Sequence, residues 1–290
     1  MSEWVIAERA HVPKGAGRGE DLLVTVEDDL GLRCVGVIDG ATDKSGRTYG
    51  GLSGGALAAE RVAASLRSLP ADTGPAAAVA AVTAGLARLR REWGVSEDDP
   101  LAPSAVAAVL LPRRRLVWRV GDVHLAIGRA GGWEHHRGDK AIDRVLAGAR
   151  AAYLHCLLAE GRSVAELARE DPGRELVLPV LRRQSVLANR EEAGPLGFGV
   201  LDGRRVPDRF VEVFPLDHEV LEVALASDGY LSAAERLRHA EDELAASLRA
   251  DPMRIGAHPS TKGLTPGTVS FDDRTYVRVR RSADDTVAAG

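Results

Sequence analysis

The stretch Val35-Gly36-Val37-Ile38-Asp39-Gly40 joins an apolar run to a carboxylate and a glycine. A run rich in β-branched residues predicts a buried strand, and the Asp-Gly pair after it predicts the turn at which that strand ends. A side chain at the end of a buried strand is held at the rim of the sheet, and the glycine leaves room for another backbone, a ligand or an ion to approach. Asp39 is therefore the first candidate functional residue.

Two later stretches repeat this pattern of a strand that ends in an aspartate. They are Trp118-Arg119-Val120-Gly121-Asp122 and Val223-Ala224-Leu225-Ala226-Ser227-Asp228-Gly229. Each stretch alone is also compatible with an ordinary strand-ending turn, because short motifs match by chance. Three strands that deliver carboxylates together predict a cluster, and hard divalent cations bind clusters of oxygen ligands.

The hydrophobic periodicity predicts runs of strands separated by pairs of helices. We expect strands at 3–12, 22–27, 32–38, 104–111, 116–120, 124–128, 131–136, 210–214, 219–226 and 275–280. We expect helices at 53–69 and 75–93, within 139–187, and at 232–249, the last opened by Ser232 and Glu235 as a capping box. Strands that follow one another in runs favour antiparallel sheets and the α+β class.

This order of elements predicts a four-layer αββα sandwich, in which two antiparallel β-sheets are flanked by helix pairs. We expect one domain over residues 1–290, with its core at about 3–281, a helical insert at about 139–187 and a loose C-terminal tail at 282–290. Neither a linker-like stretch nor an internal repeat divides the sequence.

The composition argues against several classes of partner. A formal net charge of −4 and an aromatic content of 4% disfavour nucleic acid, whose binding needs a basic surface. No stretch of the sequence is apolar for long enough to span a membrane, and its first residues do not resemble a secretion signal. We therefore expect a cytoplasmic protein with no nucleic-acid partner and no membrane partner.

Further acidic residues accompany the three aspartates. Glu20 and Asp21 follow a glycine-rich loop, and Asp272 and Asp273 precede the last strand. No histidine or cysteine spacing typical of zinc accompanies them, so the all-carboxylate set favours Mg²⁺ or Mn²⁺. Two such ions that share a carboxylate can lower the pKa of a shared water and bind a phosphoryl oxygen. This chemistry predicts hydrolysis of phosphate esters without a covalent enzyme intermediate.

Five motifs, in order, make the chain similar to a divergent, bacterial-type member of the PPM-type metal-dependent protein phosphatases (protein phosphatase 2C-like). The similarity covers roughly residues 3–281. The motifs are Gly19-Glu20-Asp21; Ile38-Asp39-Gly40; Ser104-Ala105-Val106-Ala107-Ala108-Val109 followed by Trp118-Arg119-Val120-Gly121-Asp122; Ala226-Ser227-Asp228-Gly229-Tyr230-Leu231; and Asp272-Asp273-Arg274-Thr275. The resemblance implies the αββα fold and a Mg²⁺- or Mn²⁺-dependent phosphatase.

The resemblance also implies two or three Mg²⁺ or Mn²⁺ ions held by a set of seven residues: Glu20, Asp21, Asp39, Gly40, Asp122, Asp228 and Asp272. In that arrangement Asp39 bridges two ions, and the carbonyl group of Gly40 is a further ligand. Asp228 and Asp272 complete the shell of the second ion, and Asp122 holds a weaker third ion together with Asp228. Asp39 and Asp228 are the residues expected to be catalytic.

Two departures from the family pattern bear on the substrate. In many family members the Asp-Gly pair is followed by His-Gly-Gly or Met-Gly-Gly, whereas Ala41 and Thr42 follow it here. The family's phosphate-binding arginine is expected at position 16, where this chain has alanine. We expect Arg18, or else Lys14, to bind the phosphate instead.

We expect a phosphatase that acts on phosphoserine and phosphothreonine in proteins. The alternative substrate is a small phosphate monoester, such as a phospho-sugar or a nucleotide intermediate, because the family histidine and arginine are missing and segment 139–187 could enclose a pocket. A non-catalytic, phosphate-sensing relative is a third hypothesis, which is disfavoured because unpaired carboxylates packed together are costly without a cation.

The Gly-x-Ser-x-Gly pattern at 51–55 is a weaker signal, for a serine nucleophile. A nucleophile of that kind needs a strand directly before the serine, whereas a polar, glycine-rich loop precedes Ser53. We expect Ser53 to cap the following helix instead.

Overall fold

The computed structural model describes residues 4–42, 44–97 and 99–282, and its named strands form two five-stranded antiparallel sheets. The first, called here the β3 sheet, has the order β2 (Leu22–Asp28), β3 (Gly31–Gly40), β4 (Ala105–Leu111), β5 (Leu116–Val120) and β8 (Glu212–Pro215). The second, called the β9 sheet, has the order β1 (Trp4–Val12), β10 (Arg274–Arg281), β9 (Glu222–Ala226), β6 (His124–Arg129) and β7 (Gly132–His136). Of the predicted tail, residues 283–290 lie outside the described residues.

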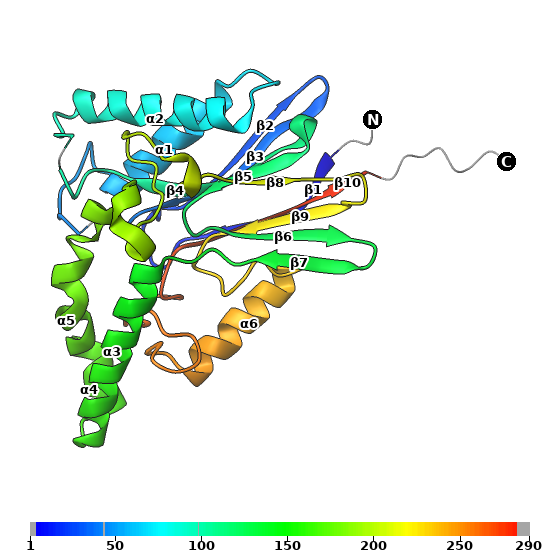
Figure 1. The fold of residues 1–290 in the computed structure, drawn as a ribbon. Coiled ribbons are helices and arrows are strands. Elements are labelled where there is room, and N and C mark those ends of the chain that lie inside the picture. Colours follow the sequence, from blue (N-terminus) through cyan, green and yellow to red (C-terminus); the bar gives the residue numbers. More distant parts are fainter. Residues whose placement is uncertain (1–3, 43, 98, 283–290) are drawn as a thin grey trace.

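The helices supply the outer layers (Figure 1). They are α1 (Gly54–Arg67), α2 (Pro75–Glu92), α3 (Ala141–Ala159), α4 (Val164–Glu170), α5 (Pro172–Leu181) and α6 (Leu237–Ala250). α1 and α2 cover the outer face of the β3 sheet, and α6 covers the outer face of the β9 sheet, while α3, α4 and α5 project beyond one end of both sheets. The predicted α+β class and four-layer sandwich are confirmed. In the described ranges, no helix is both long and apolar enough to cross a membrane.

The side chains of β3 alternate between two hydrophobic cores. Val35 and Val37 lie in the core between the two sheets, whereas Cys34 and Ile38 lie in the core under α1 and α2. Because successive side chains of a strand point to opposite faces, Asp39 falls on the same side as Val35 and Val37, at the point where the strand ends. The alternation therefore directs its carboxylate to the space between the sheets.

The helical insert expected at 139–187 consists of α3, α4, α5 and a 3₁₀ turn at Gln184–Leu187. α3 and α5 pack against each other through Ile142, Leu146, Val177 and Leu181. The insert thus has a small hydrophobic core of its own, beside the end of the two sheets (Figure 1).

α6 begins later than the sequence predicts. It starts at Leu237, with Arg236 at its N-cap position, rather than at the capping box expected from Ser232 and Glu235. Glu8 of β1 accepts a hydrogen bond from the N–H group of Leu237 (3.1 Å). A distant strand therefore satisfies a free N–H group of the first helical turn, and a local sequence pattern carries no trace of that contact.

Candidate metal centre

A cavity of about 290 Å³ opens where the ends of the two sheets meet the insert. Four of the predicted metal ligands line it: Asp39, Asp122, Asp228 and Asp272. Its remaining walls come mainly from the loop around residue 100, from α3 and α5, and from the loop between α6 and β10. The structure thus gathers carboxylates from four distant segments around one space.

Gly40 is required where β3 meets the start of α1. Its N–H group donates a hydrogen bond to the carbonyl oxygen of Glu20 (3.2 Å). A Cβ atom at this position would lie 2.4 Å from the carbonyl oxygen of Gly55 and 2.5 Å from that of Glu20, which leaves no space for a side chain. The close approach of these backbone segments fixes the end of β3, and with it Asp39.

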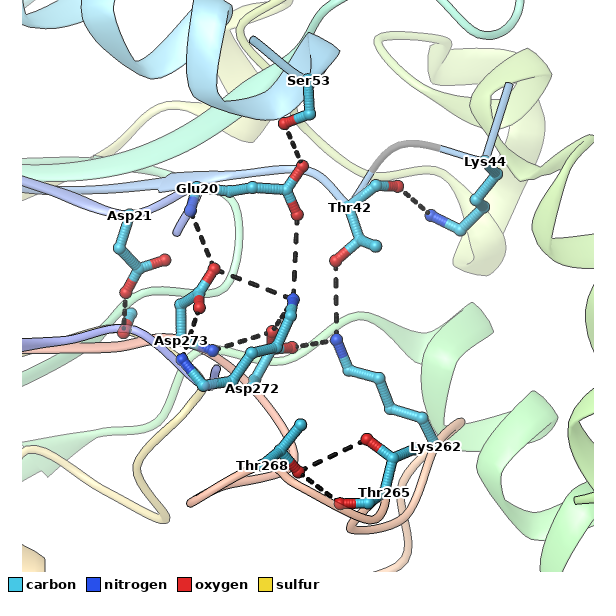
Figure 2. A network of polar contacts seen from close by, with 12 residues as sticks. Glu20, Asp21, Thr42, Lys44, Ser53, Lys262, Thr265, Thr268, Asp272 and Asp273 are labelled. Carbon is cyan, nitrogen blue, oxygen red and sulfur yellow. Dashed lines mark hydrogen bonds and ion pairs between the residues drawn. The ribbon is translucent and has the colours of Figure 1, made fainter. Parts of the chain in front are cut away.

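Ser53 caps α1 and holds Glu20 in place (Figure 2). Its hydroxyl oxygen accepts a hydrogen bond from the N–H group of Ala56 (3.3 Å), and the hydroxyl group donates to Oε1 of Glu20 (2.6 Å). The prediction that Ser53 is a helix cap is confirmed. The hydroxyl group of Ser53 is therefore engaged in a structural hydrogen bond to Glu20 of the acidic cluster.

Asp21 is buried, with only 3% of its surface exposed. The hydroxyl group of Ser227 donates a hydrogen bond to its Oδ2 atom (2.6 Å), and the N–H group of Thr275 donates to the Ser227 oxygen (2.9 Å). Burial raises the pKa of Asp21 to about 8, and the charges of Asp272 and Asp228 act in the same direction, against the hydrogen bond from Ser227. Asp21 thus backs the cluster and is tied to the segment that carries Asp228.

The carboxylates of Asp39 and Asp228 have no hydrogen-bond or ion-pair partner within residues 4–42, 44–97 and 99–282. Burial raises the pKa of Asp39, and the charges of Asp228 and Asp21 raise it further. Burial and the charges of Asp122 and Asp272 likewise raise the pKa of Asp228 to about 7. Both groups are therefore held where a negative charge is disfavoured unless a cation joins them.

Asp272 differs, because two lysines hold it (Figure 2). Nζ of Lys14 lies 3.2 Å from its Oδ1 atom, and Nζ of Lys262 lies 2.5 Å from its Oδ2 atom. Lys14 also lies 3.9 Å from Glu20 and 3.7 Å from Asp273. Burial disfavours the charged forms, but the ion pairs outweigh it, so that the pKa of Lys14 is raised and the pKa of Asp272 is lowered.

Asp122 is also paired with a lysine. Nζ of Lys140, the residue that precedes α3, lies 2.9 Å from its Oδ2 atom. Its Oδ1 atom is buried and has no hydrogen-bond partner among the residues that the structure describes. Burial opposes the charge of Lys140, but Asp122 and Asp143 outweigh burial and raise the pKa of this lysine. The insert therefore delivers a cation directly to a predicted metal ligand.

The lysines of this chain are confined to the site. Only four of its 38 basic residues are lysines, namely Lys14, Lys44, Lys140 and Lys262. Lys44, Lys140 and Lys262 line the cavity, and Lys14 reaches the adjoining acids. Sequence reasoning missed these three cavity lysines. Their rarity was the available signal, because a chain that uses arginine almost everywhere retains lysine where a compact ammonium group is needed.

Arg18, the predicted phosphate-binding residue, lies at the edge of this region. Its side chain is 63% exposed and pairs with Glu60 at 2.6 Å. Asp273 shapes the loop on which Arg18 lies, because it accepts hydrogen bonds from the N–H groups of Lys14 and Glu20, both 2.8 Å long. The role of Arg18 stays a prediction, and Lys14 is the basic residue of this loop that reaches the acidic cluster.

The donor set fits a divalent cation at Asp39 and Asp228. In the described part of the chain no three Asp, Glu, His or Cys side chains are grouped to hold an ion. Mg²⁺ does not require such a group, since it is bound through one or two carboxylates and keeps several of its waters. Asp39 and Asp228 offer two carboxylates that are unpaired in the described part of the chain and whose repulsion a cation would relieve, whereas Asp272 and Asp122 are already paired with lysines.

We predict that the metal-free protein loses stability as the pH rises from about 6.5 to 8. In the folded protein Asp21 and Asp228 have pKa values of about 8 and about 7, whereas both are ionised in the unfolded chain at these pH values. The folded state therefore binds more protons, and the free energy of unfolding falls by up to about 1.4 kcal/mol per pH unit and proton. His124, whose pKa burial lowers to about 4, sets the lower limit because it titrates near 6.5 when unfolded. Lys44 sets the upper limit, because burial lowers its pKa to about 8 and the unfolded chain keeps this proton up to about pH 10.

Thermal unfolding in EDTA at several pH values measures this slope. Asp228→Asn should flatten it, because one of the titrating groups is lost. Asp217→Asn is the matched control, since Asp217 is exposed and its pKa is lowered by hydrogen bonds from Arg129 and from backbone N–H groups. A wild-type stability that is constant or rises over this range would contradict the raised pKa values.

The sequence itself matches no family model and no curated protein. Among solved structures, a bacterial serine phosphatase superposes with a TM-score of 0.51 at 13% identity, over 99% of this chain and 100% of that one. The Mycobacterium tuberculosis serine/threonine phosphatase PstP/Ppp gives 0.49 at 18% identity over 96% and 100% of the two chains. The catalytic domain of PstP in complex with two manganese ions gives 0.48 at 17% identity over 97% and 100%. The chain thus has the fold of that bacterial serine phosphatase.

Proposed function

We propose that this protein is a Mg²⁺- or Mn²⁺-dependent phosphatase that hydrolyses phosphate monoesters, with phosphoserine and phosphothreonine of proteins as its substrates. The observation that carries the proposal is a pair of carboxylates, Asp39 and Asp228, that have no partner among the described residues and lie in one cavity of a chain with a serine phosphatase fold. Their repulsion favours a cation, and the lysines around them favour an anionic group beside it.

In this proposal Asp39 and Asp228 bind the cation, with the carbonyl group of Gly40 beside them. Asp21 supports the site from behind through its hydrogen bond from Ser227. The bound ion would supply two effects, a lower pKa for water and stabilisation of the charge on the phosphoryl group. The chain's own contribution is to hold the carboxylates at rigid strand ends, so that little rearrangement accompanies the reaction.

The lining of the cavity supplies positive charge for the phosphate. Lys44, Lys140, Arg174 and Lys262 all face it from different segments. Arg174 is fixed by a hydrogen bond to the carbonyl oxygen of Thr261 (2.9 Å). Fixed charges in a partly water-excluded space attract an anion more strongly than the same charges on an open surface.

Lys44 is the cavity residue best suited to protonate the leaving oxygen. Burial and the charge of Arg174 lower the pKa of Lys44 to about 8, which is near the value at which a general acid is most effective at neutral pH. Its ammonium group donates a hydrogen bond to the carbonyl oxygen of Thr42 (3.0 Å). Lys44 would thus replace the family histidine that this sequence lacks.

A second candidate substrate is a small phosphate monoester. The observation that favours it is the wall that the insert adds to the cavity, with Asp143 and Arg144 from α3 and Arg174 from α5. The volume of about 290 Å³ is close to the lower end of the range for pockets that enclose small molecules, about 300–1,000 Å³.

We predict that the protein hydrolyses p-nitrophenyl phosphate with Mn²⁺ or Mg²⁺ and stops in EDTA. Asp39→Asn and Asp228→Asn should each lower kcat/KM by more than about 100-fold, since even the outer-shell partners of a metal are worth 10- to 100-fold. Asp217→Asn, an exposed aspartate, is the control and should keep wild-type activity. Full activity in both site variants would contradict the assignment.

The two substrate classes are separated by kcat/KM on a phosphothreonine peptide and on a panel of sugar phosphates and nucleotides. We predict the higher value for the peptide, because of the fold shared with a serine phosphatase. A higher value for a metabolite would instead support the enclosed-pocket alternative. If no compound is hydrolysed in a metal-dependent manner, both substrate proposals are wrong, and the result would support the hypothesis of a non-catalytic, phosphate-sensing protein.

We predict that Lys44→Met slows the hydrolysis of an alkyl phosphate by about 100-fold or more, which is the usual contribution of a general acid. The same variant should change the rate on p-nitrophenyl phosphate by only about threefold, because p-nitrophenolate leaves without protonation. Lys44→Arg should behave like Lys44→Met, since a guanidinium keeps its proton. Equal losses on the two substrates would show that Lys44 only binds the phosphate.

A further inference from the structure

We propose that Lys14 and Lys262 take the place of a second metal ion at Asp272, so that the centre binds a single divalent cation at Asp39 and Asp228. This inference rests on the proposed function for the position of that one cation. It departs from the arrangement of two or three ions that the sequence resemblance implies for the same carboxylates.

Both oxygen atoms of Asp272 are occupied by donors. Oδ1 accepts from Nζ of Lys14 (3.2 Å) and from the N–H group of Asp273 (3.0 Å), and Oδ2 lies 2.5 Å from Nζ of Lys262. The side chain of Asp272 is only 18% exposed, so these ion pairs are less screened than pairs on the surface. A metal ion could bind here only by displacing an ammonium group.

The acidic side chains next to Asp272 also have ion-pair and hydrogen-bond partners within the chain. Lys14 lies within 4 Å of Glu20 and Asp273 as well, at 3.9 and 3.7 Å. Glu20 also accepts from Ser53, and Asp273 accepts from two N–H groups of the loop at 14–20. Two ammonium groups of the chain therefore offset much of the negative charge of these three carboxylates, whereas the carboxylates of Asp39 and Asp228 have no such partner among the described residues.

The use of lysine rather than arginine at Asp272 supports the proposal that ammonium groups take the place of a metal ion. An ammonium group is a compact point charge on a flexible stem, whereas a guanidinium is a planar fork that needs more space. Lysine occurs at only four positions of this chain, and two of them converge on one carboxylate from segments that are far apart in the sequence. Lys262 also lines the cavity, so its charge faces the space where a substrate would lie.

The test measures how many Mn²⁺ ions the metal-free protein binds. Titration calorimetry gives the number of ions per chain, and electron paramagnetic resonance shows whether two bound ions are coupled. The wild type should bind one ion per chain, with the spectrum of an isolated Mn²⁺. The double variant Lys14→Met/Lys262→Met should bind a second ion and show the spectrum of a coupled pair, because Asp272 and Glu20 are released. Arg129→Met removes a half-buried positive charge that pairs with acids outside the cavity, Glu134 and Asp217, and it should still bind one ion.

Two ions in the wild type, or a single ion in the folded double variant, would overturn the inference while leaving the proposed phosphatase intact. Binding of no ion by the wild type would overturn both. Thermal unfolding with and without Mn²⁺ shows whether the double variant is folded. If the double variant is not folded, the single variant Lys262→Met serves as the test. Its affinity for a second Mn²⁺ ion should be at least about tenfold higher than that of the wild type. An unchanged affinity for the second ion would overturn the inference.

Discussion

Electrostatic repulsion among carboxylates at one end of the sandwich is the constraint on which the rest of the site depends. Asp39 lies near the end of β3 and Asp228 lies two residues after β9, and the inner faces of both strands contribute to the core between the two sheets, so the packed sheets hold the two carboxylates close together. In surroundings of low dielectric constant this repulsion is relieved only by protonation or by positive charge. Positive charge beside these two carboxylates therefore stabilises the folded protein.

Part of this positive charge comes from lysine side chains of the protein itself. Lys14, Lys140 and Lys262 come from the loop before β2, the start of α3 and the loop after α6, and each pairs with a carboxylate of the cluster. The segments of Lys140 and Lys262 also form walls of the cavity, so the ion pairs of these two lysines both reduce repulsion and shape the space for a substrate. Loss of one partner of a buried pair is strongly destabilising, because the other charge is left uncompensated.

The fold was largely predictable from local patterns. A continuous apolar, β-branched run identifies β3, and the period of two along any strand then fixes the face on which Asp39 lies. Ser53 was predictable as a helix cap from the polar loop before it. The start of α6 was not, since its first N–H groups include one that bonds to Glu8 of a distant strand.

The acids of the candidate site were predictable from the sequence, and Lys14 was considered as a phosphate-binding residue, but the pairing of Lys14, Lys140 and Lys262 with these acids was not, because no periodicity encodes such long-range contacts. The most direct test of the account is anomalous diffraction from crystals of the protein soaked in Mn²⁺. We predict one anomalous peak, between the carboxylates of Asp39 and Asp228, with Lys14 and Lys262 still bound to Asp272. A peak at Asp272 in place of the lysines, or no peak beside Asp39, would contradict the account.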